Sequence, residues 1–294
     1  MKTNELKFTL MKILPKPIFK LVYFIWSHIA IHIFSFFWKN KLNNFKAPTV
    51  KEVNASGVKF QILIDPENGT VDNEIFLAGV YEPHFLSVIK EHLKEGGTYV
   101  DIGSNIGQHA LFSSVVVGNT GKVIAFEPVK RIYEQFLKSV DINNFKNIIL
   151  YNNGCGERVE NLPIYSSNEN AGASSVLSSD NKQKIGDIDI IVPDDILIKE
   201  DKISLIKIDV EGFELEVLQG LKNTISKFKP IIFIEYSPYY YRMKDANKGK
   251  EIIQFLKSFN YNIFDIENQK YISVDDFEYY ESNNIMQTNF LCTI

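Results

Sequence analysis

From Gly96 to the C-terminus, short apolar runs alternate with segments of helical period. β-branched and aromatic residues dominate the runs, which is typical of buried strands. The predicted strands are residues 98–103, 122–128, 147–153, 204–212, 230–238, 261–266 and 289–294, and the predicted helices are residues 105–117, 129–143, 213–225 and 250–259. Strands that alternate with helices form parallel βαβ units in a doubly wound sheet, where ligands bind beyond the carboxyl ends of the strands. The pattern therefore predicts an α/β fold and indicates where a site should lie.

Two segments stand outside this alternation. Residues 59–93 indicate a strand, a turn and helical material, and a polar, serine-rich interval covers residues 166–184. The length of 294 residues suffices for one α/β domain with an appendage. Cys155 and Cys292 lie far apart and form no Cys/His cluster, so neither a disulfide framework nor a zinc site is predicted. A reducing, cytosolic setting fits this cysteine usage.

The first 46 residues differ in charge from the rest of the chain. They carry eight lysines against one glutamate, whereas the remainder is net acidic. An acidic body argues against nucleic acid as a partner, because phosphate contacts need clustered Lys or Arg. We place the domain boundary after residue 47, so that residues 48–294 form the α/β domain and residues 1–47 a basic, aromatic-rich helical segment.

Residues 21–38 form an apolar run flanked by lysines. A narrow polar stripe recurs in it at helical spacing, at Ser27, His28, His32 and Ser35. Three arrangements fit such a helix: it lies on an anionic membrane surface through residues 16–41, it spans the membrane, or it packs on its own domain or a partner. It lacks a small-residue cleavage site, which argues against a removed signal peptide. We expect a cytoplasmic protein, held at the cytosolic face of a membrane if this helix attaches.

Two glycines and an asparagine occupy the turn after the first strand of the alternation, in VDIGSNIGQHA at residues 100–110. Because glycine has no Cβ, the backbone at Gly103 and Gly107 can turn tightly and admit a small ligand against its amides. A dinucleotide site expects GxGxxG, whereas this turn contains GxNxG preceded by Asp101. An acid there repels a pyrophosphate and suits an ammonium or a sulfonium group. S-adenosylmethionine carries both.

Polar side chains follow most of the predicted strands. They are Asp101, Asn105, Glu127, Asn152, Asn153, Asp209, Glu211 and Glu235. Glu127 lies about 20 residues beyond the glycine turn, where a carboxylate can hold the two hydroxyls of a ribose. Its alternative role is to stabilise the N-terminus of the following helix. The spacing between Glu127 and the turn favours a nucleoside ligand.

Four motifs, DIGSNIG, AFEP, IKIDVEGFELEVLQG and FIEYSP, resemble in this order and spacing the FkbM-type family of S-adenosylmethionine-dependent methyltransferases. The resemblance covers roughly residues 78–294. It implies a class I methyltransferase fold, a Rossmann-like, seven-stranded and mostly parallel sheet with helices on both faces and an antiparallel last strand. It also implies transfer of a methyl group to a hydroxyl, often on a sugar or a polyketide-type acceptor.

The same resemblance implies which residues bind the cofactor. The expected set is Glu82, Asp101, Gly103, Ser104, Asn105, Gly107, Glu127 and Asn153. The residues around the glycine turn would surround the methionine part, Glu127 would hold the ribose, and Asn153 would lie near the adenine. The acceptor contacts of the family vary too much to be carried over, so the acceptor stays open among sugars, glycolipids and related small molecules.

Methyl transfer to an alcohol needs a group that removes the hydroxyl proton. The candidates are Asp209, Glu211, Glu235 and His109. Asp209 and Glu211 are two residues apart, so they point the same way if the strand continues, although Glu211 could instead complement the following helix. Glu235 follows an apolar run, where an unpaired carboxylate is costly. Lys207 either pairs with one of these acids or reaches the solvent.

Oxygen-rich acid clusters can also hold Mg²⁺, but the spacing shows no third ligand, so a divalent metal is an open alternative that we do not favour, and we assign no metal ligands. The predicted activity is O-methylation that uses S-adenosylmethionine. Two alternatives from other classes remain at this point, a nicotinamide-dependent oxidoreductase and a non-catalytic, membrane-associated binding module. The GxNxG turn and the absence of a Tyr-x-x-x-Lys pair near the fourth strand argue against the oxidoreductase.

Overall fold

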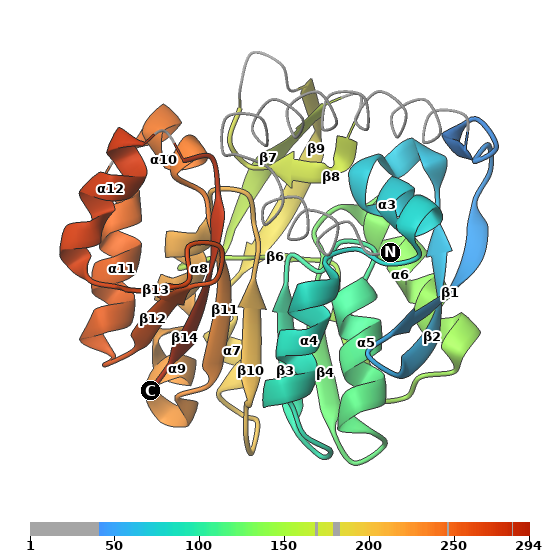
Figure 1. Ribbon diagram of the computed structural model, residues 1–294, viewed down its shortest axis with the longest axis horizontal. Coiled ribbons are helices and arrows are strands. Elements are labelled where there is room, and N and C mark those ends of the chain that lie inside the picture. The colour runs from blue at the N-terminus through green and yellow to red at the C-terminus, as the bar shows by residue number, and fades with distance from the viewer. Residues whose placement is uncertain (1–40, 168–169, 179–182, 246, 284) are drawn as a thin grey trace, which may run out of the picture. The chain divides into compact units, whose positions relative to one another are not determined.

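The computed structural model describes residues 41–167, 170–178, 183–245, 247–283 and 285–294 (Figure 1). The chain divides into two compact units, Met1–Lys46 and Ala47–Ile294. The apolar run at residues 21–38, with its predicted helix, lies outside the described residues. Among the residues that are described, no helix has the length and apolar character needed to cross a membrane.

The second unit is built on an eight-stranded sheet with the order β13-β12-β14-β11-β10-β3-β4-β5. Its strands are β3 (Thr98–Ile102), β4 (Lys122–Phe126), β5 (Ile148–Tyr151), β10 (Leu205–Ile208), β11 (Ile231–Tyr236), β12 (Asn262–Asp265), β13 (Lys270–Ile272) and β14 (Thr288–Thr293). Strands β5, β4, β3, β10 and β11 are parallel neighbours, and β14 runs antiparallel to both β11 and β12. The predicted antiparallel last strand is confirmed.

One strand exceeds the predicted seven. β13 pairs antiparallel with β12 after a short turn and extends the sheet at that edge. It has only three residues, and the middle one, Tyr271, is 71% exposed, so its sequence carries little of the periodic apolar pattern that indicates a strand.

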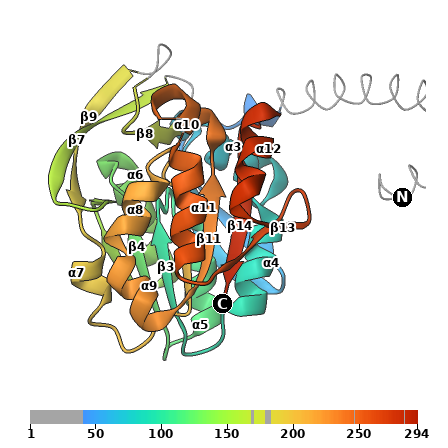
Figure 2. The same cartoon turned by 90° about the vertical axis from the view of Figure 1, so that its left-hand side faces the viewer.

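Helices cover both faces of this sheet, as predicted. The helices are α3 (Thr70–Ala78), α4 (Pro83–His92), α5 (Gln108–Val117), α6 (Lys130–Asn143), α7 (Asp194–Leu197), α8 (Glu214–Gly220), α9 (Lys222–Phe228), α10 (Pro238–Lys244), α11 (Lys248–Ser258) and α12 (Phe277–Ser282). In Figure 2, α11 and α9 lie on one side of the strands and α4 on the other. Helix coverage on both faces explains why every residue of β3 and β10 is buried.

Two further sheets were not predicted, although the first of them contains the strand expected at the start of residues 59–93. A hairpin of β1 (Thr49–Ala55) and β2 (Val58–Ile64) contacts α5 and α6. A four-stranded sheet, ordered β6-β9-β7-β8, is formed by β6 (Gly154–Cys155), β7 (Glu160–Ser167), β8 (Asn170–Ser175) and β9 (Gln183–Ile191). The serine-rich interval at residues 166–184 therefore contains β8 and the start of β9, where polar residues weakened the strand pattern.

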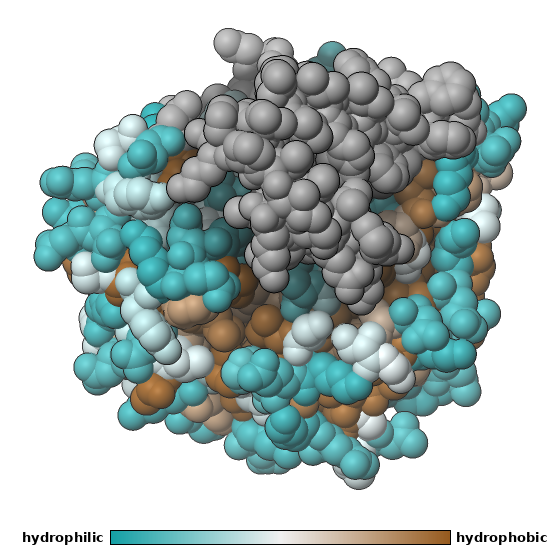
Figure 3. Space-filling view, in the orientation of Figure 1, coloured by the Kyte–Doolittle hydropathy of each residue, from teal (hydrophilic) through white to brown (hydrophobic). Residues whose placement is uncertain are grey.

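The surface that faces the viewer in Figure 3 has hydrophilic residues along its edges and apolar residues mainly in its centre. Buried side chains form a core on both faces of the large sheet. The largest of them include Phe126, Phe233 and Tyr236. This core fixes the positions at which the parallel strands end.

Candidate functional site

A cavity of about 410 Å³ lies at the carboxyl ends of β3, β4, β10 and β11. Its volume is in the range of small-molecule sites. Nine predicted site residues line it: Gly103, Ser104, Asn105, His109, Glu127, Asn153, Asp209, Glu211 and Glu235. Three others, Glu82, Asp101 and Gly107, are not part of the described wall. The structure thus gathers most of the predicted cofactor and catalytic residues in one place.

The glycine turn has the backbone geometry that the sequence predicts. The φ angles of Gly103 and Gly107 are +80° and +85°, in the region that favours glycine. Contacts within the protein also require glycine at both positions. A Cβ on Gly103 would lie 1.8 Å from the carbonyl oxygen of Asp209, and a Cβ on Gly107 would lie 2.2 Å from the ring of Phe136. Gly107 thus allows the close packing of Phe136 from α6, and its place in a ligand-binding turn stays a prediction.

Replacing Gly107 with Ala is expected to lower the free energy of unfolding by at least about 2 kcal/mol more than the matched replacement Gly79→Ala. Gly79 has the same φ of +85°, but nothing lies within 4 Å of the position its Cβ would take. The comparison separates the clash with Phe136 from the strain of a positive φ. Urea denaturation of both variants measures the difference, and equal losses would contradict the packing role.

Both oxygens of the Glu127 carboxylate bind backbone amides. Oε2 accepts a hydrogen bond from the Asn105 N–H at 2.9 Å, and Oε1 accepts one from the Val129 N–H at 2.8 Å. The first bond shapes the glycine turn and the second caps the approach to α6, so the alternative role of Glu127 at this helix is present in the structure. Burial raises the pKa of Glu127 to about 7. The carboxylate also lines the cavity.

Lys207 pairs with two acids and does not reach the solvent, which was the alternative left open by the sequence. Its Nζ lies 2.8 Å from Asp209 Oδ2 and 3.9 Å from Asp101 Oδ1. Burial lowers the pKa of Lys207, but the charges of Asp209 and Asp101 outweigh it and hold that pKa above its usual value. Asp101 is fully buried, and burial raises its pKa to about 6. Asp101 therefore lies outside the described wall and contacts a residue of that wall, Lys207.

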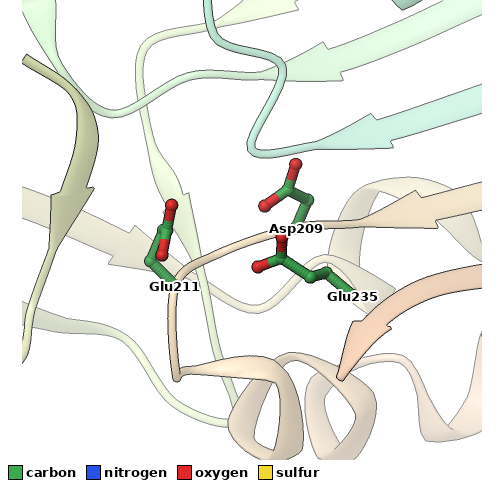
Figure 4. Close-up of side chains that lie close together, drawn as sticks. All are labelled: Asp209, Glu211 and Glu235. Atoms are coloured by element: carbon green, nitrogen blue, oxygen red, sulfur yellow. The ribbon is translucent and has the colours of Figure 1, made fainter. Parts of the chain in front are cut away.

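Three carboxylates converge at the ends of β10 and β11. Each of Asp209, Glu211 and Glu235 has an oxygen within 4.8 Å of the other two (Figure 4). Burial and the neighbouring charges of Asp209 and Glu211 raise the pKa of Glu235, whose Oε2 accepts a hydrogen bond from the Ser237 hydroxyl at 3.0 Å. Like charges this close favour a shared proton or a bound cation. Glu235 adds a third carboxylate at this point, so the three acids present oxygen atoms of the kind that divalent metals bind.

Glu211 and Gly212 turn the chain out of β10. Their φ angles are +54° and +99°, and a Cβ on Gly212 would lie 2.7 Å from Tyr240 and from Leu177. The chain therefore bends at Gly212 as the sequence predicts, and the strand ends at Ile208, before Glu211. The condition for Asp209 and Glu211 to point the same way, a strand that continues through both residues, is therefore not met. The turn brings Glu211 close to Asp209, and the end of β11 brings Glu235 close to it.

Glu82 lies behind His109. Its φ is +43°, a rare conformation for a residue with a side chain, and its Oε2 lies 3.6 Å from His109 Nε2. Burial raises the pKa of Glu82 to about 7 and lowers that of His109 well below its usual value. His109 lines the cavity as a neutral imidazole, whereas Glu82 supports it from outside the described wall.

Some cavity residues were not predicted as binding residues. Tyr81 is held by Gln108, which accepts a hydrogen bond from the Tyr81 N–H at 2.8 Å and donates one to the Tyr81 carbonyl at 2.7 Å. An apolar wall comes from the four-stranded sheet, at Ile164, Ile188 and Ile190. No local pattern signals these contacts, because they depend on how distant segments meet. Tyr239 and Tyr240, from the segment that follows β11, also line the cavity.

Comparisons with known proteins find similarity to methyltransferases. Residues 101–263, more than half of the chain, match the family described as the Methyltransferase FkbM domain. Hexuronic acid methyltransferase AglP of Haloferax volcanii is 25% identical over 195 residues, which cover 65% of this chain and 76% of that protein. A probable cobalt-precorrin-6B C(15)-methyltransferase (decarboxylating) of Sulfurisphaera tokodaii is 28% identical over 143 residues, which cover 47% of this chain and 73% of that protein.

Among solved structures, the methyltransferase FkbM of Methylobacillus flagellatus is 18% identical with a TM-score of 0.43. That match covers 75% of this chain and 54% of the other, so the chain spans about half the length of that protein. The family match over residues 101–263 includes the glycine turn, Glu127 and all three converging carboxylates. The chain belongs to the FkbM family of S-adenosylmethionine-dependent methyltransferases.

Proposed function

We propose that this protein transfers a methyl group from S-adenosylmethionine to a hydroxyl of a sugar, glycolipid or related small molecule. The observation that carries the proposal is one cavity lined both by the glycine turn with Glu127 and by the carboxylates of Asp209, Glu211 and Glu235. The first group has the chemistry to hold an adenosyl cofactor, and the second can receive a proton. The relative from Haloferax volcanii, a hexuronic acid methyltransferase, supports a sugar as the acceptor.

The residues present fit the cofactor. Glu127 offers carboxylate oxygens to ribose hydroxyls, Asn153 and the apolar side chains of Val129 and Ile190 suit an adenine, and the acidic wall suits the positive charges of the methionine part. When bound, S-adenosylmethionine supplies a methyl group on an already activated sulfur. The protein must then fix the acceptor oxygen in line with that methyl group and exclude water.

Asp209 is the base that we favour among the four candidates. Its side chain is 28% exposed, and Lys207 holds one of its oxygens at 2.8 Å, which leaves the other for the proton of the acceptor hydroxyl. Glu235 is disfavoured because its raised pKa keeps the proton on the carboxyl group, from which it can donate a hydrogen bond to the acceptor. His109 is disfavoured because its side chain is buried and its Nε2 lies 3.6 Å from Glu82 Oε2, outside the described wall. Glu211 lies nearby and can accept hydrogen bonds from acceptor hydroxyls.

The charge of the cavity wall limits which sugars are suitable acceptors. With the proton kept on Glu235, three acids of the described wall, Glu127, Asp209 and Glu211, still face one Lys or Arg side chain, Lys207, whose charge is already shared by Asp101 and Asp209. A carboxylate on the acceptor near its reacting hydroxyl would meet like charges in a partly desolvated site, which costs binding free energy. A neutral or amino-bearing sugar fits this wall better than a uronic acid does.

Incubation of oligosaccharide and glycolipid fractions with methyl-tritiated S-adenosylmethionine tests the proposal. We expect a labelled ether whose methylated sugar passes through an anion-exchange column after release by acid hydrolysis, because the favoured acceptor carries no carboxylate. Protein denatured by heat is the control. A label that is lost on mild base treatment, as from a methyl ester, would contradict O-methylation of a hydroxyl, and a labelled uronic acid would contradict the charge preference.

Because the chain belongs to a methyltransferase family, we reject the alternative of a nicotinamide-dependent oxidoreductase. The membrane alternatives concern residues 1–47, and attachment through residues 16–41 stays a proposal based on their basic and aromatic composition.

A further inference from the structure

We propose that Lys207 is a positioning residue that ties the cofactor turn to the acceptor acids. This inference rests on the proposed function and deepens it. The ammonium group of Lys207 contacts one residue from each part of the site, the Gly103 carbonyl at 3.4 Å and Asp209 Oδ2 at 2.8 Å. A single side chain therefore sets where both parts lie.

Lys207 reaches this position from the centre of the sheet. It lies on β10 directly opposite Asp101 on β3, and its side chain is only 3% exposed. Neither oxygen of the Asp101 carboxyl has a hydrogen-bond partner among the described residues, and Lys207 Nζ at 3.9 Å is its cation. Asp101 thus holds the lysine head from the side that faces away from the cavity.

Stability alone does not explain a lysine here. Removing two acids and a lysine from water carries a desolvation cost that often exceeds their mutual attraction, and apolar residues of similar size would hold the strands at least as well. What apolar residues could not do is donate hydrogen bonds to a carbonyl of the turn and to a carboxylate of the acceptor site. The Lys207 ammonium does both.

The effect on the site follows from these bonds. The bond to Asp209 Oδ2 fixes the rotamer of that carboxylate, so that its second oxygen is available in the cavity. The bond to the Gly103 carbonyl orients the peptide that begins the turn, whose amides lie against the cofactor in the proposed function. Without the lysine, the turn and the carboxylate would each sample other positions, and cofactor binding would carry the entropic cost of ordering them.

Calorimetry with S-adenosylhomocysteine tests this inference without an acceptor. We expect Lys207→Met to weaken binding at least about tenfold, and Lys207→Arg, which keeps the charge and the donors, to stay within about threefold of the native protein. Hydrogen exchange of the turn amides at residues 104–107 should become faster in Lys207→Met and stay near native in Lys207→Arg.

A structural control separates positioning from simple loss of stability. Ile263→Ala removes a fully buried side chain from β12, outside the cavity wall, and should lower stability without lowering affinity. If Lys207→Met does not fold, because Asp101 is left buried and charged, the double variant Asp101→Asn/Lys207→Met removes both charges and is expected to show the same loss of affinity. Native affinity in either folded variant, equal losses in the Met and Arg variants, or an equal loss in Ile263→Ala would overturn the proposal. Failure to find a methylated product would count against the proposed function and leave this binding test intact.

Discussion

Replacing Glu127 with Gln is expected to weaken the binding of S-adenosylmethionine by about 100-fold or more. The carboxylate already accepts the Asn105 and Val129 amides, and in the proposed function it also receives ribose hydroxyls. In glutamine, an NH₂ group replaces one of the two carboxylate oxygens. This donor would face a backbone N–H and could not form a hydrogen bond with it. Each hydrogen bond to a charged group contributes about 1.5–3 kcal/mol, and about 1.4 kcal/mol corresponds to a tenfold change in affinity. Titration calorimetry with the cofactor measures the change.

The matched control is Glu134→Gln on α6, which changes an exposed carboxylate seven positions further along and should leave affinity unchanged. Thermal unfolding of both variants reports whether the turn itself is disturbed. Native affinity in a folded Glu127→Gln protein would show that Glu127 only caps α6, and the assignment of the ribose position would be wrong.

Replacing Asp209 with Asn is expected to slow methyl transfer by about 10²- to 10⁴-fold, the usual contribution of a general base. Cofactor affinity should stay within about threefold, because the amide oxygen of asparagine can still accept the hydrogen bond from Lys207. A large loss of rate with little loss of affinity is the signature of a group that acts in the chemical step. Single-turnover transfer of tritium to the acceptor fraction that the native protein labels measures the rate.

Asp195→Asn, at an exposed position of α7, is the control for adding an asparagine to the surface and should transfer at the native rate. A rate within threefold of native in Asp209→Asn would move the role of base to Glu211 or His109. A loss of cofactor affinity equal to the loss of rate would instead assign Asp209 to binding.

The central sheet was predictable from sequence because its strands carry strong local signals. β3 and β10 are buried on both faces, so their residues form continuous apolar runs, and the amphipathic α6 and α11 separate strands with clear helical periodicity. β13 and β8 escaped prediction for the opposite reason. One has three residues and the other lies in a polar, serine-rich interval, so packing in three dimensions decides their conformation.

The site was predictable where it depends on strand ends and less so elsewhere. Parallel strands end at one edge, so the acids after β4, β10 and β11 had to meet there. The sequence could not show that Phe136 fills the space at Gly107, or that Asp101 faces Lys207 across two strands. These contacts depend on the register of strands and the packing of helices, which the order of residues does not display.

The four-stranded sheet gives the cavity a wall that is separate in sequence from its reactive groups. Ile164, Ile188 and Ile190 come from one continuous stretch between β5 and α7, whereas the acids come from the ends of β4, β10 and β11. Mutations that accumulate in that stretch can therefore reshape what the cavity admits while the proton-handling groups stay as they are. A chain built in this way can change its acceptor specificity during evolution while its catalytic groups stay the same.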